Sequence, residues 1–393
     1  MSTPNTDSDT DSENGDISVE VHDIKQQGSF KEAILIAGGV MNVHGGVYFG
    51  GNRDAKNSGS SENDLLAVHS HSTNFGGEVW PEDEPEDEVV DKESTRSIAA
   101  AYCATSNYKI YFQVGSFIHE AGYIKGNWSI TAHISAPSAK EDTPIAAISC
   151  PRGSTIHIFY ITSENFIHEV YWSASKGWST GSLTSKTLKV SSYSSLSATW
   201  SAQALKVYCQ RGSMLCELEY QFYPGDWTFR TLTDALPGTA IACTSYAGDD
   251  ETVYHVYYQD EDHMLREYVY EFEDELDYDF PNIEAPPYTP LTAISWYIDG
   301  AYIRLYFVDN DGGIQELYNE ADEKWNEVHT LPSVQKVEKS SQLAALEQND
   351  GRLINLYHSL SEERLAQLSF SKSHDEDPGV RSILNEASSA APN

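Results

Sequence analysis

The sequence predicts an all-β protein built from six repeated units, and three observations support this prediction. One pattern recurs about every 49 residues between positions 96 and 371. Each copy contains four short β-rich pieces with no helical periodicity between them. Each copy also opens on a run of small apolar residues, which suits a crowded inner strand. Six four-stranded antiparallel blades form a six-bladed β-propeller, whereas the repeats of the rival β-solenoid are usually shorter and build parallel sheets.

Two columns of the repeat show its regularity. The first column is mostly basic: Lys109, His157, Lys206, His255, Arg304 and Asn355. The second is mostly acidic: Glu120, Glu169, Glu217, Glu267, Glu316 and Gln367. The repeat therefore brings a base and a carboxylate together in most copies.

The four strands of each repeat are predicted in a fixed order. The inner strands begin near Ile98, Ile145, Leu196, Ile241, Leu291 and Leu343. An aromatic-rich alternating strand and a turn follow, and the third strand contains the acidic column. The fourth strand starts near an aromatic residue in five repeats: Trp128, Trp178, Trp227, Tyr278 and Trp325. The sixth repeat lacks this residue, so part of residues 33–51 is a candidate for its missing outer strand.

Three regions follow from the composition. Residues 1–95 form an acidic, Gly/Ser-rich extension that is expected to be mostly disordered, with an extended charge run at 81–88. Residues 96–372 form the propeller, and 373–393 are expected to be a disordered tail. An acidic insertion at 271–287 in the fourth repeat is expected to be a mobile surface loop. The first residues do not resemble a signal peptide, which favours a cytoplasmic protein or one exported without such a signal.

The charge and the motifs argue against several classes of function. A net charge of −35 without a basic stripe disfavours nucleic acid and anionic membranes as partners, and no apolar run is long enough to span a bilayer. The five cysteines include no C-x-x-C pair, and we interpret Cys103 and Cys150 as buried free thiols. No spacing indicates a metal, a phosphate loop or a nucleophile, so no cofactor is expected. A glycosidase would need two carboxylates at one bond, but each site offers one.

The base and the carboxylate suggest a binding chemistry. In the fifth repeat, Arg304 and Glu316 are equidistant from a turn near Asn310, which predicts that they face each other across the ladder with Cβ atoms about 5 Å apart. A guanidinium beside a carboxylate offers hydrogen-bond donors and acceptors in a fixed frame. Sugar hydroxyls need both, and a neighbouring indole would pack against the apolar face of a sugar.

The runs Arg304-Leu-Tyr-Phe, Ile314-Gln-Glu-Leu-Tyr and Leu265-Arg-Glu-Tyr, with the tryptophan at each blade edge, resemble the fungal fucose-specific lectins over residues 96–371. The resemblance implies fucosylated glycans as partners, bound without catalysis in pockets between blades. Each pocket would combine a base and a glutamate of one blade with an aromatic residue of the next. The implied sets are Lys109, Glu120 and Trp178; His157, Glu169 and Trp227; Lys206, Glu217 and Tyr278; His255, Glu267 and Trp325; and Arg304 with Glu316.

The chain departs from the family pattern in every pocket. Only the fifth repeat keeps arginine, and lysine or histidine replaces it elsewhere, with loss of the bidentate fork. Asn355 and Gln367 lack the charged pair altogether. We therefore expect fewer and weaker sites than in a typical member. The two histidine pockets predict binding that changes between about pH 5.5 and 7.5.

Two other interpretations remain at this stage. Each base and glutamate can be an ordinary cross-strand ion pair that contributes about 0.2–1 kcal/mol. The chain can also be a protein-interaction propeller with decayed sugar sites, which would use the acidic extension and residues 271–287 as contact surfaces. The sequence leaves open whether the chain forms a homodimer.

Overall fold

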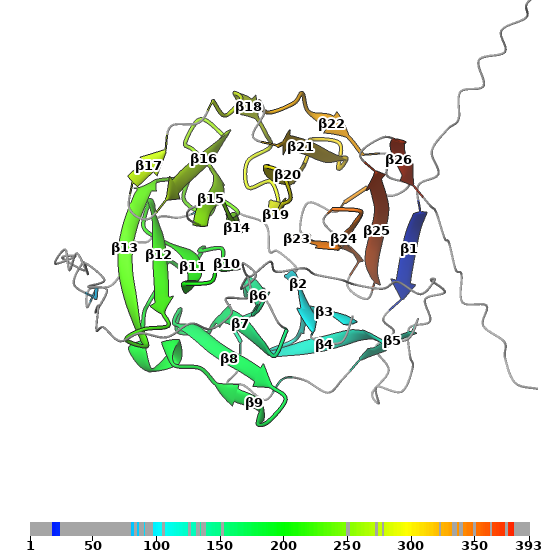
Figure 1. Ribbon diagram of the computed structural model, residues 1–393. Coiled ribbons are helices and arrows are strands. Elements are labelled where there is room, and N and C mark those ends of the chain that lie inside the picture. The colour runs from blue at the N-terminus through cyan, green and yellow to red at the C-terminus, as the bar shows by residue number, and fades with distance from the viewer. Residues whose placement is uncertain are drawn as a thin grey trace, which may run out of the picture.

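The computed structural model is a ring of six β-sheets around a central axis (Figure 1). It describes residues 18–23, 80–81, 85, 90, 97–103, 107–124, 127–130, 134, 139–150, 153–248, 252–271, 274–276, 279–321, 324–331, 336–337, 341–348, 351–361, 364–373 and 376–380. The inner strands contact one another in the order β2, β6, β10, β14, β19, β23 and again β2, so the ring is closed. The predicted six-bladed all-β propeller is confirmed.

The strands follow one another from the axis outwards in each blade, with every pairing antiparallel. Blade 1 contains β2 (Ile98–Cys103), β3 (Asn107–Val114), β4 (Phe117–Ile124) and β5 (Asn127–Ile130). Blade 2 contains β6 (Ile145–Ser149), β7 (Thr155–Ile161), β8 (Ile167–Ser173) and β9 (Gly177–Thr180). Blade 3 contains β10 (Ser197–Trp200), β11 (Ala204–Arg211), β12 (Met214–Gln221) and β13 (Asp226–Asp234).

The second half of the ring is less regular in its outer strands. Blade 4 contains β14 (Ala242–Ala247), β15 (Thr252–Gln259), β16 (Met264–Glu271), β17 (Asp274–Leu276) and β18 (Ile283–Glu284). Blade 5 contains β19 (Thr292–Tyr297), β20 (Ala301–Val308), β21 (Ile314–Glu320) and β22 (His329–Thr330). Blade 6 contains β23 (Leu343–Gln348), β24 (Leu353–Ser361), β25 (Arg364–Ser373), β26 (Glu376–Val380) and β1 (Ser18–Asp23).

The hydrophobic core is divided into six clusters, and each lies between two neighbouring blades. This arrangement explains why the second strand of a blade is apolar or aromatic on both faces. All eight residues of β15 and all eight of β20 are buried, because each face of the strand packs against an adjacent sheet. Any polar side chain on these strands is therefore enclosed between blades, and the base column lies there.

The outer strand of blade 6 comes from the other end of the chain. β1 pairs antiparallel with β25, with Val19 opposite Leu368 and Val21 opposite Ala366 (Figure 1). The sequence suggested residues 33–51 for this role, and it predicted disorder for the segment that contains β1. The alternation of Val19 and Val21 with polar residues was the missed signal. Residues 33–51 lie outside the described residues.

Three other predictions differ from the structure. β26 lies within the predicted C-terminal tail and pairs with the end of β25, where Phe370 is opposite Val380. Within the predicted mobile loop at 271–287, β17 and β18 both pair with β16. These two strands form hydrogen bonds with the backbone groups at the edge of β16. The acidic side chains of the segment do not prevent this pairing. The predicted fourth strand near Trp325 begins only at His329.

A channel of about 930 Å³ runs along the axis and is lined by the six inner strands. Small side chains line most of it because six strands converge there.

All five cysteines are free thiols; Cys103 and Cys150 line the channel and are half-buried, in contrast to the predicted burial. Among the described residues, the only helix is a four-residue 3₁₀ turn (Leu183–Lys186), so none has the length needed to cross a membrane.

A buried histidine in β24 should make the stability of the propeller depend on pH. Burial lowers the pKa of His358 from 6.5 to about 4, although its hydrogen bond to the carbonyl of Ser359 opposes the shift. The unfolded chain therefore binds a proton between pH 6.5 and 4 that the folded chain does not bind. The free energy of unfolding should fall as the pH drops through this window, by about 1.4 kcal/mol at pH 5.5 relative to pH 7.5 from this group alone.

Urea titrations at pH 7.5 and 5.5 measure this effect, and they avoid the lower pH at which an acidic chain loses its net charge. His358→Asn keeps an N–H donor but does not titrate, so its free energy of unfolding should change by about 1.4 kcal/mol less than that of the parent. The exposed His329 provides the matched control His329→Asn. An equal pH dependence in the parent and His358→Asn would contradict the assignment.

Candidate functional site

The predicted base and carboxylate columns lie on the same face of each sheet, but they are not directly opposite. Arg304 is opposite Tyr318, and Glu316 is opposite Tyr306. The reason is the turn. The carboxylate of Asp309 accepts hydrogen bonds from the backbone N–H groups of Asp311 and Gly313, both at 2.8 Å, and centres the hairpin on Asp311 instead of Asn310. A shift of the centre by one residue moves the register by two and leaves the face unchanged.

The same offset applies around the ring, so each pair is diagonal. Long side chains bridge such diagonals. We number the sites by the blade that supplies the pair. Site 1 joins Lys109 Nζ to Glu120 at 2.8 Å; site 2 joins His157 Nδ1 to Glu169 at 2.8 Å; site 3 joins Lys206 Nζ to Glu217 at 3.2 Å; site 4 joins His255 Nδ1 to Glu267 at 2.8 Å; and site 5 joins Arg304 Nε to Glu316 at 3.6 Å.

The residue opposite each glutamate is aromatic. The hydroxyl groups of Tyr111, Tyr257 and Tyr306 donate to Glu120, Glu267 and Glu316 at 3.0, 2.7 and 2.9 Å. Burial, together with the charge of the glutamate, raises the pKa of all three phenols well above its usual range. These tyrosines therefore stay protonated and act as fixed donors that orient the carboxylates.

The tryptophans of the next blade pack against the aromatic residues that lie opposite the glutamates. Trp178 contacts Tyr111 with ring centroids 6.1 Å apart, Trp227 contacts Phe159 at 6.2 Å, and Trp325 contacts Tyr257 at 6.2 Å, all edge to face. The predicted combination of a pair from one blade with a tryptophan from the next is thus present at sites 1, 2 and 4. Tyr278, predicted for site 3, lies outside the described residues.

A second aromatic column, which was not predicted, lies three residues after the glutamate in the repeat. Its members are Tyr123, Trp172, Tyr220, Tyr270, Asn319 and Phe370. Trp172 lies 5.2 Å from Lys109 Nζ of site 1, and Tyr270 lies 4.9 Å from Lys206 Nζ of site 3. Both contacts are cation–π interactions. Five aromatic residues at one repeat position were a detectable signal.

A tryptophan at or near the end of an inner strand is also part of two sites. Trp200, at the end of β10, lies against His157 with ring centroids 5.2 Å apart. Trp296, near the end of β19, lies 5.2 Å from the guanidinium of Arg304. The wall of site 2 thus includes a residue from the inner strand of the next blade, and the wall of site 5 includes one from the inner strand of the same blade. Neither tryptophan belongs to the predicted columns.

Site 3 is filled by its own side chains. Arg230 of β13 is directly opposite Glu217 and donates to it at 2.8 Å, and Tyr270 of blade 4 donates to the other oxygen. Burial alone would raise the pKa of Glu217, but Lys206, Arg230 and the hydroxyl of Tyr270 outweigh burial and lower it. The charged side chains Lys206, Glu217 and Arg230 pair with one another, so the carboxylate of this site is already occupied by groups of the protein.

Site 5 keeps the predicted arginine, but the arginine points elsewhere. Arg304 Nη1 donates to the carbonyls of Ile303 at 3.0 Å and Asn319 at 3.2 Å, and Nη2 donates to Glu320. Its side chain is 1% exposed.

In site 6, Gln367 donates to Asn355 at 2.9 Å and to Ser369 at 2.9 Å, which gives a neutral polar cluster.

Sites 1 and 2 are the most accessible of the charged pairs. Lys109 and His157 are 16% and 14% exposed, whereas Lys206, His255 and Arg304 are 4% exposed or less. In site 2, the second oxygen of Glu169 accepts the backbone N–H of Leu183 at 2.8 Å, which fixes the carboxylate beside the histidine. No group of three or more His, Cys, Asp or Glu side chains in the described part of the chain is arranged to hold a metal.

The ring of blades and the repeated base, carboxylate and tryptophan define a propeller with binding pockets between its blades. The family model of the fungal fucose-specific lectins matches residues 94–376, and the chain belongs to this family, a non-enzymatic class of proteins. The fucose-specific lectin of Aspergillus fumigatus is 29% identical over 235 residues, which cover 56% of this chain and 74% of that protein. The fucose-specific lectin of Aleuria aurantia is 30% identical over 200 residues, which cover 48% of this chain and 61% of that protein.

Solved structures show the same fold. The crystal structure of the Aleuria aurantia lectin, described as a six-bladed β-propeller, superposes with a TM-score of 0.62 at 23% identity, covering 75% of this chain and 97% of that one. The SapL1 lectin in complex with α-methyl fucoside superposes with a TM-score of 0.62 at 24% identity, covering 75% of this chain and 98% of that one.

Proposed function

We propose that this protein is a lectin that binds fucosylated glycans, without catalysis, at sites 1 and 2. The observation that supports this most directly is that both sites keep a base–carboxylate pair whose base is more exposed than in the other charged sites, beside a tryptophan of the next blade, within a family of fucose-specific lectins. The carboxylate accepts hydrogen bonds from two sugar hydroxyls, and the lysine or histidine donates one. In site 1 the indole of Trp178 packs against the C–H face or the methyl group; in site 2, where Trp227 is only 4% exposed, the half-buried Trp200 beside His157 takes this role.

The other sites are proposed not to bind. Arg230 and Tyr270 already satisfy Glu217 in site 3, and Arg304 in site 5 is committed to two backbone carbonyls and Glu320. Site 6 lacks charge. Site 4 keeps all three parts, but the side chains of His255 and Glu267 are only 2% and 1% exposed, and Phe280 packs on Trp325. A ligand would have to displace these rings.

Isothermal titration with L-fucose, and with galactose as the control sugar, tests the proposal. The expected result is two sites per chain for fucose and none for galactose. Glu120→Gln and Glu169→Gln should each remove one site, and Glu267→Gln should leave the number at two. An absence of heat with either sugar would reject the lectin proposal in favour of the protein-interaction propeller.

Gly181 should be a requirement of site 2. A Cβ atom at this position would lie 2.0 Å from Cδ of Glu169 and 2.2 Å from its Oε2. Gly181→Ala should push the carboxylate away from His157 and from Leu183, and reduce the fucose affinity of site 2 by at least about tenfold, the effect of one lost charged hydrogen bond. Titration should then count one strong site, with site 1 as the internal control. Unchanged binding at two sites would contradict the position of Glu169.

A further inference from the structure

The turn between β12 and β13 exposes two adjacent aromatic side chains. It consists of Phe222, Tyr223, Pro224 and Gly225, closed by the Gly225 N–H donating to the carbonyl of Gln221 at 3.0 Å. Phe222 is 40% exposed and Tyr223 is 93% exposed. The equivalent turn of blade 2, residues 174–176, is Ala-Ser-Lys, and that of blade 5, residues 321–323, is Ala-Asp-Glu. In the sequence of blade 4, Phe272 occupies the position of Phe222 and is followed by a glutamate, so the pair of adjacent aromatic residues, with Tyr223, is particular to blade 3.

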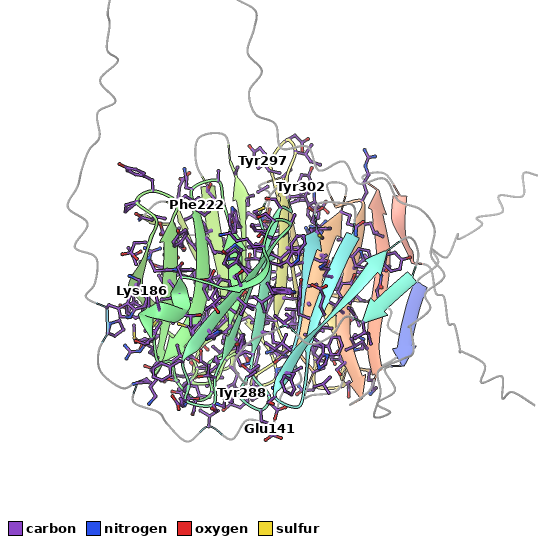
Figure 2. All side chains as sticks on the ribbon, turned by 90° about the horizontal axis from the view of Figure 1, so that it is seen from below. Glu141, Lys186, Phe222, Tyr288, Tyr297 and Tyr302 are labelled. Carbon is purple, nitrogen blue, oxygen red and sulfur yellow. The ribbon has the colours of Figure 1, made fainter. Side chains whose placement is uncertain are left out.

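This turn is continuous with site 2. The ring of Phe222 lies 5.0 Å from that of Trp200, and Trp200 lies 5.2 Å from the ring of His157. The N–H of Phe222 also donates to the carbonyl of Gln203, at 3.5 Å, in the turn that follows Trp200. Figure 2 shows Phe222 at the same end of the propeller as Tyr297 and Tyr302, and opposite Tyr288 and Glu141. A row of aromatic rings thus leads from the pair of site 2 to the surface.

The size of this row indicates its occupant. We call Trp200, Phe222 and Tyr223 the aromatic shelf. A stable contact between two protein copies buries about 800 Å² on each partner, whereas a fully buried aromatic side chain contributes only about 150–250 Å². Three rings, of which Trp200 is already half-buried, are too small for such a contact. They suit one flat ligand ring that packs its C–H face on them while the hydroxyl of Tyr223 and the exposed amide of Gln203 meet its polar edge.

We infer that the aromatic shelf is a second subsite of site 2, and that it holds the pyranose to which a bound fucose is attached. This inference rests on the proposed function. Fucose would occupy the His157–Glu169 pair, and the glycosidic bond would lead the next sugar across Trp200 onto Phe222 and Tyr223. The equivalent turn beside site 1, residues 174–176 of blade 2, has no aromatic residue, so the two sites should differ in their preference for glycans longer than one sugar.

Titration of one isolated site tests the inference. Glu120→Gln removes site 1, and in this background α-methyl-L-fucoside is compared with a fucosyl-N-acetylglucosamine disaccharide. The disaccharide should bind on the order of tenfold more tightly, as stacking of one ligand ring on an aromatic side chain provides. Phe222→Ser with Tyr223→Ser should abolish this gain and leave the affinity for the methyl fucoside unchanged. The matched control is Phe117→Ser, which removes an exposed phenylalanine (46%) of blade 1.

The outcomes separate the subsite from the lectin. If the methyl fucoside binds but the disaccharide gains nothing, or if the gain survives in the double variant, the subsite is overturned and the proposed function stands. If neither sugar binds the Glu120→Gln protein although fucose binds the parent at one site, site 2 is not a sugar site and the subsite falls with it. If neither sugar binds any variant or the parent, the proposed function itself is rejected.

Discussion

Glu217→Ala is expected to destabilise the propeller by about 3–5 kcal/mol, the range for removing one partner of a buried ion cluster. The side chain of Glu217 is 1% exposed and accepts hydrogen bonds from Lys206, Arg230 and Tyr270. Its removal leaves two cations between blades 3 and 4 with less than their full set of partners. Lys206 keeps Glu219 at 2.9 Å, but Glu219 is partly exposed and compensates only in part. Urea unfolding at neutral pH measures the loss.

Two further variants separate charge from packing in this cluster. Glu217→Gln keeps the shape and can still accept hydrogen bonds, so it should be less destabilising than Glu217→Ala while still leaving a buried excess of positive charge. The triple variant Lys206→Met, Glu217→Leu and Arg230→Met replaces the whole cluster, and it should be closer to the parent than either single variant, because apolar replacement of a complete buried network is often neutral. A triple variant that is less stable than Glu217→Ala would show that the cluster is a net stabilising feature.

The fold was predictable from the sequence because the propeller is a sum of similar units. Each blade must bury both faces of its second strand against its neighbours, and this requirement repeats the same aromatic pattern about every 49 residues. The closure of the ring was harder to predict. β1 is only six residues long and lies 74 residues upstream of β2, and no local pattern states which sheet edge a short strand will join.

The candidate site was predicted in its composition but not in its geometry. The columns of bases and glutamates identified the pairs, yet the position of one turn decided that the partner opposite Arg304 is Tyr318. The sequence also could not show that Arg230 enters site 3, because an arginine in an outer strand is ordinarily solvent-exposed. Its place opposite Glu217 depends on the register of β12 and β13, which shifts between Leu215 and Cys216. The pairing register of the strands thus decides which sites are filled by protein side chains and which are left accessible to a ligand.

Gly351→Ala is expected to destabilise the junction of blades 5 and 6 by about 2–5 kcal/mol. Gly351 has a φ of +76°, where an alanine costs about 1–2 kcal/mol. Its Cβ would also lie 2.2 Å from Cζ2 of Trp296, and overpacking of this kind costs about 1–3 kcal/mol. The indole cannot move away easily, because it stacks on Tyr302 with ring centroids 5.6 Å apart and lies against the guanidinium of Arg304.

A second glycine separates the two contributions. Gly115 has a φ of +59°, and no atom lies within 4 Å of the position that its Cβ would take. Gly115→Ala should therefore show the backbone effect alone, and the difference between the two variants in urea unfolding should equal the clash with Trp296, about 1–3 kcal/mol. In a Trp296→Leu background, Gly351→Ala should cost less than it does in the parent, since the smaller side chain leaves room for the methyl group. Equal losses for Gly351→Ala and Gly115→Ala would mean that Trp296 does not press against this turn in solution, and that blades 5 and 6 are packed less tightly than the structure has them.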